Sequence, residues 1–321
     1  MRPVVAVDIG GTHSRFAIAW IGGGRVHSIG AATTLKTADH ASFEAAWQAF
    51  AASRGPLPRA AAIAFAGPVQ GDTLQLTNSH WVVRPALLPD RLAVDDFVLV
   101  NDFGAVAHAV AQAGADQFTH LCGPDTPLPD IGVISVIGPG TGLGVAQLLR
   151  GSVGYQVVET EGGHIDFAPL DGFEDGLLAM LRHRMPRVSV ERIASGSGLA
   201  SLYEALAARD GVPPLARDDK ALWTAAMDGS DRQAVAALDR FCMTLGSVAG
   251  DIALAQGADA IVIAGGLGAR LVGRLPQSSF ADRLAAKGRF APRMRALPVK
   301  AITLAEPGLF GAAAAYAREH P

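Results

Sequence analysis

The chain has 321 residues, of which 50% are hydrophobic and 6% aromatic, a composition that excludes a disordered protein. The formal net charge is -3, and Lys and Arg occur in no run longer than a pair. The sequence therefore lacks the clustered basic residues with which proteins bind nucleic acid or an anionic membrane. The length favours two domains with a cleft between them, so we expect an α/β enzyme with small-molecule partners.

Cysteine usage and the amino terminus bear on the compartment. Cys122 and Cys242 lie too far apart in the sequence for a metal cluster, in apolar surroundings that indicate buried thiols in a reducing compartment. The first apolar run is interrupted by Asp8 and is too short for a signal peptide, and no apolar stretch is long enough to span a bilayer. We therefore expect a cytoplasmic protein that has no membrane partner.

The chain opens with a strand, a glycine loop and a second strand. Residues 3–9 and 15–21 are apolar runs that predict antiparallel strands around Gly10-Gly11-Thr12. Adjacent glycines expose backbone N–H groups that suit an anionic phosphate, although a plain hairpin turn also explains them. Asp8 favours a phosphate together with a cation such as Mg²⁺, because a carboxylate beside a phosphate would otherwise repel it.

The next elements are short. Residues 42–52 fit an amphipathic helix with Ser42 as its cap, and residues 60–66 and 74–77 predict strands. The polar cluster from Asn78 to Trp81 could touch a substrate, but we interpret it as a loop. Residues 85–91 predict a short helical or irregular connection.

An acidic corner follows. Residues 97–100 predict a buried strand and residues 103–113 a helix, so Asn101 and Asp102 lie at the corner between them. Ligands of open α/β sheets gather outside the carboxyl ends of the strands, which favours a cleft position for Asp102. A helix N-cap explains the same aspartate equally well, and the two interpretations stay open here.

The middle of the chain repeats the opening pattern. Residues 132–137 and 145–149 predict two strands around the glycine run 138–144, and Gly140-Thr141 falls where Gly11-Thr12 fell. This recurrence suggests two related domains whose glycine loops face a shared cleft. Chance recurrence in a chain with 37 glycines is the alternative.

The densest group of ionisable residues follows a predicted strand at residues 155–158. It extends from Glu159 to Asp166 and contains Glu161 and His164, without the spacing of metal ligands. A structural role for His164 is the alternative, although paired glycines beside it indicate a tightly turned, exposed backbone.

Helices dominate the remainder. Residues 232–256 predict a long helix that is apolar nearly all round and therefore central to the packing. Gly265 to Gly268 follow a late strand and could border an adenine or ribose, because a backbone without side chains allows a flat approach. The other predicted helices are 174–183, 199–208, 221–227, 280–288 and 307–318, and the late strands are 260–264 and 299–304.

The glycine loops complete neither the P-loop pattern nor the Rossmann fingerprint. They resemble instead the phosphate and adenosine loops of the sugar kinase, heat-shock ATPase and actin superfamily, and within it the chain closely resembles the bacterial glucokinase family over essentially its whole length. The motifs that carry the resemblance are Asp8-Ile9-Gly10-Gly11-Thr12, Leu76-Thr77-Asn78, Asn101-Asp102-Phe103, Gly140-Thr141-Gly142-Leu143-Gly144-Val145, Glu161-Gly162-Gly163-His164-Ile165-Asp166-Phe167-Ala168-Pro169, Glu191-Arg192, Ser195-Gly196 and Ala264-Gly265-Gly266.

The resemblance implies a fold and a reaction. The fold is an α/β two-domain actin-like ATPase fold (ribonuclease H-like, duplicated) with the active site in the interdomain cleft. The small domain comprises residues 1–112 completed by the C-terminal helix 305–321, and the large domain comprises residues 113–304. The reaction is ATP-dependent phosphorylation of D-glucose at the 6-hydroxyl, the first step of glucose catabolism, with Mg²⁺ as cofactor and a homodimer as the assembly.

The resemblance also implies residue roles. Asp102 is the general base that accepts the proton of the 6-hydroxyl; the link of Asp8 to Mg²⁺ rests on the phosphate argument given above. The residues implied to bind the sugar are Asn101, Asp102, Gly140, Thr141, Glu161, His164 and Glu191. Those implied to bind ATP are Asp8, Ile9, Gly10, Gly11, Thr12, Gly140, Thr141, Gly265 and Gly266.

Three residues depart from the family pattern: His13 replaces a frequent Asn, Pro139 interrupts the second glycine loop, and Ser197 replaces a frequent proline. None of them removes a proposed catalytic group. The alternatives are another hexose kinase, a bare ATPase or a sugar-responsive regulator of the same fold. A regulator is disfavoured because no helix-turn-helix module precedes Val4, and kinases with a cysteine-rich zinc loop are disfavoured by the two cysteines.

Overall fold

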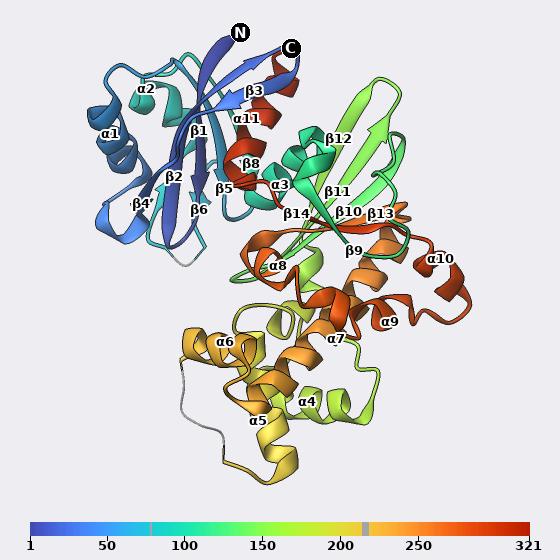
Figure 1. Ribbon diagram of the computed structural model, residues 1–321. Coiled ribbons are helices and arrows are strands. Elements are labelled where there is room, and N and C mark those ends of the chain that lie inside the picture. The colour runs from blue at the N-terminus through green and yellow to red at the C-terminus, as the bar shows by residue number, and fades with distance from the viewer. Residues whose placement is uncertain (78, 214–217) are drawn as a thin grey trace. The chain divides into compact units, whose positions relative to one another are not determined.

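The computed structural model describes residues 1–77, 79–213 and 218–321 and divides into two compact units (Figure 1). Unit 1 comprises Met1–Gly114, Val157–Glu159 and Leu304–Pro321, and unit 2 comprises Ala115–Gln156 and Thr160–Thr303. Asn78, which belongs to one of the resemblance motifs, lies outside the described residues.

Unit 1 is built on a mixed sheet with the strand order β3-β2-β1-β5-β8, and β4 pairs with β2. Strand β1 is antiparallel to β2 and parallel to β5, which is in turn parallel to β8, so β1, β5 and β8 end at one edge of the sheet. The strands are β1 (Arg2–Ile9), β2 (His13–Gly22), β3 (Arg25–Ile29), β4 (Thr33–Lys36), β5 (Ala60–Phe65) and β8 (Asp96–Asn101), with a separate small hairpin of β6 (Leu74–Gln75) and β7 (Val82–Val83).

Helices cover both faces of this sheet. Helix α1 (Phe43–Arg54) packs on one face with Phe16 and Trp81, and Ser42 caps it as predicted. Helix α11 (Pro307–Glu319) packs on the other face and against α3 (Asp102–Gln112) so closely that a Cβ at Gly311 would overlap the carbonyl oxygen of Ala105. Unit 1 is completed by α2 (Leu88–Leu92), η1 (Thr37–Asp39) and η2 (Pro85–Leu87).

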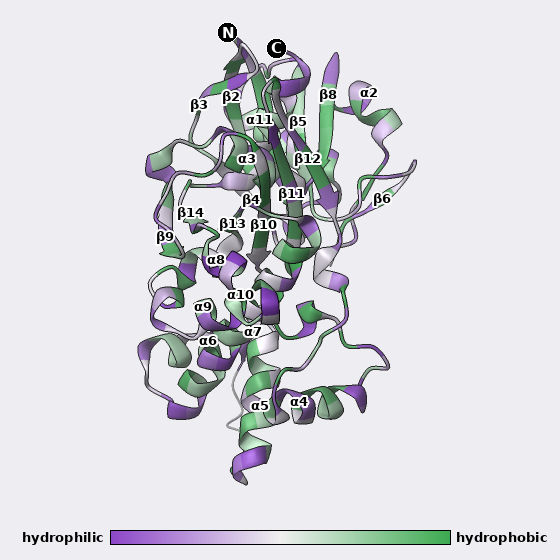
Figure 2. Cartoon of the chain, turned by 90° about the vertical axis from the view of Figure 1, so that its right-hand side faces the viewer, coloured by the Kyte–Doolittle hydropathy of each residue, from purple (hydrophilic) through white to green (hydrophobic). Residues whose placement is uncertain are grey.

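Unit 2 repeats the arrangement with the strand order β12-β11-β10-β13-β14-β9. Strand β10 is antiparallel to β11 and parallel to β13. In unit 1, β1 is likewise antiparallel to β2 and parallel to β5. The shared topology confirms the duplicated α/β fold and contradicts chance recurrence of the glycine loops. The strands are β9 (Phe118–Cys122), β10 (Gly132–Pro139), β11 (Leu143–Gly151), β12 (Gly154–Thr160), β13 (Ala260–Ile263) and β14 (Val299–Ile302); Figure 2 shows the hydrophobic character of strands such as β5, β8 and β11.

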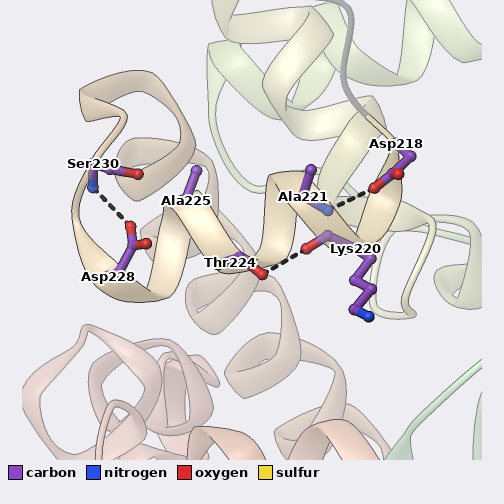
Figure 3. A pocket seen from close by; sticks show the side chains of 7 residues that line it. All are labelled: Asp218, Lys220, Ala221, Thr224, Ala225, Asp228 and Ser230. Carbon is purple, nitrogen blue, oxygen red and sulfur yellow. Dashed lines mark hydrogen bonds between the residues drawn. The ribbon is translucent and has the colours of Figure 1, made fainter.

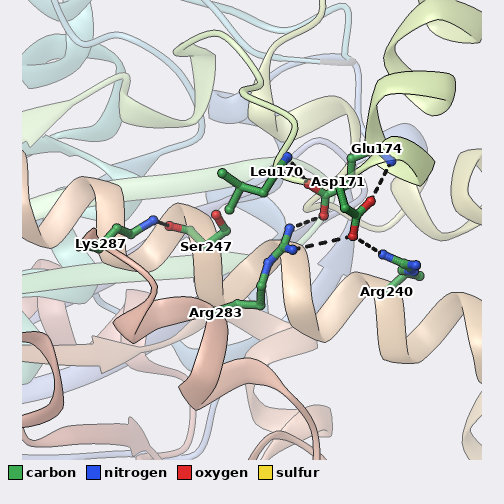
Figure 4. Close-up of polar contacts among 7 residues, drawn as sticks. All are labelled: Leu170, Asp171, Glu174, Arg240, Ser247, Arg283 and Lys287. Atoms are coloured by element: carbon green, nitrogen blue, oxygen red, sulfur yellow. Dashed lines mark hydrogen bonds and ion pairs between the residues drawn. The ribbon is translucent and has the colours of Figure 1, made fainter. Parts of the chain in front are cut away.

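Helix α7 (Arg232–Gln256) is the centre of the unit 2 core, as its apolar sequence predicted. A Cβ at Gly246 would overlap the backbone of Phe280, so α9 (Phe280–Ala285) lies directly on α7. Ion pairs join α4, α7 and α9: the buried Glu174 pairs with Arg283, and Asp171, the N-cap of α4, pairs with Arg240 and Arg283 (Figure 4). The remaining elements of unit 2 are α4 (Gly172–Arg182), α5 (Gly198–Asp210), α6 (Asp219–Asp228), α8 (Gly265–Leu271), α10 (Ala291–Arg295), η3 (Ala115–Gln117), η4 (Gly162–His164), η5 (Val190–Arg192), η6 (Leu275–Gln277) and η7 (Gly288–Phe290).

Several predictions about local structure were wrong. The strand predicted at residues 74–77 has only two residues, and the helix predicted at 280–288 ends at Ala285. Pro139 does not interrupt the loop but ends β10 opposite Leu143, because a strand end tolerates a residue without an N–H group. Cys122 is half-buried rather than buried, because it lies at the end of the edge strand β9.

Candidate active site

The corner between β8 and α3 places Asp102 at the start of a helix. Asn101, not Asp102, is the N-cap: its Oδ1 accepts the N–H groups of Phe103 at 2.8 Å and Gly104 at 3.2 Å. The Nδ2 of Asn101 donates to the carbonyl oxygen of Gly67 at 3.1 Å. Asp102 is the first helical residue, half-buried where the helix dipole favours a negative charge, and its Oδ1 also accepts the N–H of Phe103 at 2.8 Å, so Asp102 assists the cap that Asn101 supplies.

Asn101 is also held from a distant part of the chain. Its backbone N–H donates to Oε1 of Glu159 at 2.8 Å, and a Cβ at Gly104 would overlap the same carboxylate. Glu159 belongs to unit 1 although it follows β11 in the sequence. Contacts from two separate segments, at Gly67 and Glu159, thus fix the backbone beside Asp102.

The first glycine loop lies at the same edge of the sheet as Asp102. Ile9 is in register with Phe65, and Phe65 with Asn101, so two inter-strand spacings, about 10 Å, separate the end of β1 from that of β8. Thr37 closes the loop from one side, because its Oγ1 donates to the carbonyl oxygen of Gly10 at 2.8 Å and its N–H to that of Thr12 at 3.0 Å.

Asp8 carries an unfavourable charge at this edge. Burial raises its pKa from 3.8 to about 6; Arg15, whose guanidinium lies 3.5 Å away, opposes the rise in pKa, and Glu306 adds to it. Arg15 is shared with Glu306 at 2.9 Å, and a Cβ at Gly308 would lie 3.0 Å from the Asp8 carboxylate.

Asp8 is a single carboxylate beside the first glycine loop, and Mg²⁺ needs further oxygen ligands. No group of three or more metal-binding side chains exists among the described residues. Mg²⁺ commonly binds one or two carboxylates together with substrate phosphates, so a single poorly neutralised carboxylate beside a glycine loop fits such an ion.

Unit 2 gathers three of the predicted sugar-binding residues, Glu161, His164 and Glu191, around Leu143, the first residue of β11. The N–H of Leu143 donates to Oε2 of Glu191 at 3.0 Å, and a Cβ at Gly163 would overlap the carbonyl oxygen of Leu143. Gly163 lies between Glu161 and His164. The segment of Glu161 and His164 and the segment of Glu191 therefore both contact the start of β11 at Leu143.

The side chains of this group point outward. Glu161 and His164 are 62% and 57% exposed, with Oε2 and Nε2 4.0 Å apart, so His164 is not a buried structural histidine. Backbone bonds tie their loop to η5, since the N–H of Val190 donates to the carbonyl oxygen of Ile165 at 2.9 Å. Arg187 adds a clamp, bonding Asp166 at 2.6 Å and the carbonyl oxygen of His164.

A hollow of about 540 Å³ adjoins the second glycine loop within unit 2. Gly140, Thr141 and Gly266 were predicted to bind the nucleotide, and all three line it. Gly265 lies just beside it with φ +77°, and a Cβ there would meet the carbonyl oxygen of Pro139 at 2.7 Å, so glycine is required. The other residues that line the hollow are Gly196, Ser197, Asp219, Lys220, Trp223, Leu267 and Arg270.

The wall of the hollow formed by α6 was not predicted. Trp223 and Lys220 come from α6, whose sequence carries no binding motif, whereas Arg270 lies on α8, which begins with the predicted Gly265 and Gly266. A smaller hollow of about 390 Å³ lies along α6 and shares Lys220 with the first (Figure 3).

The two duplicated units, each with a glycine loop between the strands of an antiparallel hairpin, define a kinase-like ATPase of the sugar kinase, heat-shock ATPase and actin superfamily. A glucokinase family model matches residues 5–319. The chain belongs to the glucokinase family.

Individual relatives agree. The chain is 59% identical to a glucokinase of Zymomonas mobilis over 318 residues, which are 99% of this chain and 98% of the relative. The crystal structure of a glucokinase from an Antarctic psychrotroph matches with a TM-score of 0.85 and 33% identity, covering 98% of each chain. A glucokinase of the ROK family from Streptomyces griseus, solved in complex with glucose and AMPPNP, matches with a TM-score of 0.66 and 25% identity over 99% of this chain and 100% of that one.

Proposed function

We propose that this protein transfers the γ-phosphoryl group of ATP to the 6-hydroxyl of D-glucose, which yields glucose 6-phosphate and ADP. Membership of the glucokinase family over nearly the whole chain is the observation that carries this function. The Streptomyces griseus structure with glucose and AMPPNP supports the same pair of ligands for this chain.

Asp102 is the proposed general base. A sugar hydroxyl needs a nearby proton acceptor as it attacks phosphorus, and Asp102 is a half-buried carboxylate on a corner that Asn101 and Glu159 hold in place. Asn101 adds a sugar contact in this proposal, since its amide nitrogen carries two hydrogens and Gly67 takes one of them.

The sugar site is proposed at Glu161, His164 and Glu191, with Gly140 and Thr141 beside it. Carboxylates accept hydroxyl hydrogens and an imidazole can donate or accept, so this set can distinguish the stereochemistry of a pyranose. The exposed positions of Glu161 and His164 and their common support at Leu143 favour this role.

The ATP site is proposed along both glycine loops. Gly10, Gly11 and Thr12 with Ile9 in unit 1, and Gly140 and Thr141 in unit 2, would hold phosphates, and Gly265 and Gly266 would border the nucleoside. The hollow lined by Gly140, Thr141 and Gly266 supports the part of this ATP site that lies in unit 2. When bound, Mg²⁺ supplies charge neutralisation for the phosphates, with Asp8 as its protein partner.

The setting of the enzyme is part of the proposal. Both cysteines are free thiols, which supports a reducing, cytoplasmic compartment. No helix in the described part of the chain is apolar over a length that could cross a bilayer. We further propose a homodimer, a role in the first step of glucose catabolism, and a division into a small domain of residues 1–112 with 305–321 and a large domain of residues 113–304.

A coupled assay of ADP release with ATP, Mg²⁺ and a panel of hexoses tests the reaction. We expect release that depends on glucose. Equal rates with other hexoses would indicate a broader hexose kinase, sugar-independent release would indicate a bare ATPase, and no release would support a regulator.

A substitution tests the base. Asp102→Ala should lower kcat about a hundredfold or more, while glucose still binds as measured by calorimetry, on the scale usual for a lost general base. A kcat close to that of the wild type would refute the role of Asp102.

A further inference from the structure

Three hydrogen bonds in series join helix α6 to the second glycine loop. The indole Nε1 of Trp223 donates to the carbonyl oxygen of Gly196 at 2.8 Å. The N–H of Gly196 donates to the carbonyl oxygen of Gly140 at 2.8 Å, and the N–H of Gly140 donates to that of Gly142 at 2.8 Å. The series links one side chain to the shape of the loop, and we name it the Trp223 relay.

The first donor of the relay is rigidly held. Trp223 is 3% exposed, and its ring meets Phe241 of the central helix α7 edge to face, with centroids 5.1 Å apart. The guanidinium of Arg270 lies 5.7 Å from the centre of the same ring. Since packing fixes the indole, its N–H can hold Gly196 in one position.

The second member of the relay is also closely fitted. A Cβ at Gly196 would lie 3.1 Å from the carbonyl oxygen of Gly140, so the two backbones approach as glycine allows. Trp223, Gly196, Gly140 and the exposed Thr141 all line the same hollow of about 540 Å³. The relay therefore ends at the part of the hollow where the phosphates are proposed to bind.

We propose that Trp223 is a positioning residue for the nucleotide, which acts through Gly196 to hold the loop Gly140 to Gly142 in its phosphate-binding shape. A loop ordered in advance loses little entropy when the ligand binds, so affinity for the phosphates depends on the relay. This inference rests on the proposed function, because it takes the hollow as the ATP site.

Trp223→Phe tests the relay, since phenylalanine retains an aromatic ring against Phe241 but lacks the indole N–H. Titration calorimetry with ADP and with adenosine separates the phosphate loop from the rest of the hollow. We expect the Kd for ADP to rise about threefold to tenfold, the range for one lost hydrogen bond, and the Kd for adenosine to change less than about twofold.

Trp81→Phe is the matched control. Trp81 is equally buried, in unit 1, and its indole Nε1 donates to the carbonyl oxygen of His40 at 2.9 Å, so the same kind of bond is lost away from the hollow. Its Kd for ADP should equal that of the wild type. Gly196→Ala perturbs the relay without touching Trp223 and should reproduce the selective loss of ADP affinity if Trp223→Phe does not fold.

The outcomes separate the relay from the reaction. A wild-type Kd for ADP in Trp223→Phe, or in Gly196→Ala where that variant is used, or an equal loss of ADP and adenosine affinity, overturns the relay. A wild-type protein that binds ADP but does not phosphorylate glucose overturns the reaction and leaves the relay testable. A wild-type protein that binds no ADP overturns both.

Discussion

Asp8→Asn should stabilise the protein while it impairs catalysis. The Asp8 carboxylate has a pKa of about 6 against 3.8, so the folded state binds its proton more tightly than the unfolded state does. The stability that the protonated form contributes is complete below about pH 3.8 and is lost as the pH rises through about 6. At neutral pH the folded protein therefore carries a charge that favours unfolding, and Asn removes it.

The pKa shift sets the size of the effect. A rise from 3.8 to about 6 corresponds to about 3 kcal/mol above pH 7, and linkage reduces this to about 0.5 kcal/mol near pH 4. Urea unfolding of the metal-free protein in chelator, at about pH 4 and about pH 8, measures both values. The gain should be large at the higher pH and nearly absent at the lower.

The control and the functional counterpart use the same variant set. Asp72→Asn removes an exposed carboxylate of unit 1 and should change stability little at either pH. Asp8→Asn should also weaken the dependence of turnover on Mg²⁺. A gain that is absent at about pH 8, or equal at both pH values, would refute the electrostatic reasoning, and an unchanged Mg²⁺ titration would count against the metal-linked role.

Two further variants test unit 2. Glu174 is 1% exposed and pairs with Arg283 (Figure 4), so Glu174→Gln should lower the free energy of unfolding by about 1–3 kcal/mol in urea titrations. The reason is that the largely buried guanidinium of Arg283 loses its nearer carboxylate and keeps only Asp171, at 3.6 Å; a change below about 0.5 kcal/mol would contradict this. Gly163→Ala must displace the Leu143 carbonyl, so the glucose KM should rise about tenfold or more. Gly176→Ala, which meets no atom within 4 Å, should leave that KM unchanged, and equal values for the two alanine variants would refute the convergence at Leu143.

Apolar periodicity and the positions of glycines predicted most of the helices and strands. The strands, the two glycine hairpins and the full extent of α7 follow from apolar periodicity and from glycine punctuation, which depend only on near neighbours in the chain. Strands β3, β4 and β9 were missed because they are short and half-exposed, and β9 pairs with β14 from the far end of the chain.

Some features of the candidate site were predictable from the sequence, and others were not. The motif residues Asp8, Asp102 and Glu161 could be named from the chain alone, because each stands beside a strand end or a paired glycine. Only the folded structure shows that Asn101 is the cap, that Glu191 reaches Leu143, and that α6 walls the hollow with Trp223. These contacts join residues far apart in the sequence or depend on side-chain direction, so no local period or spacing encodes them; packing decides them.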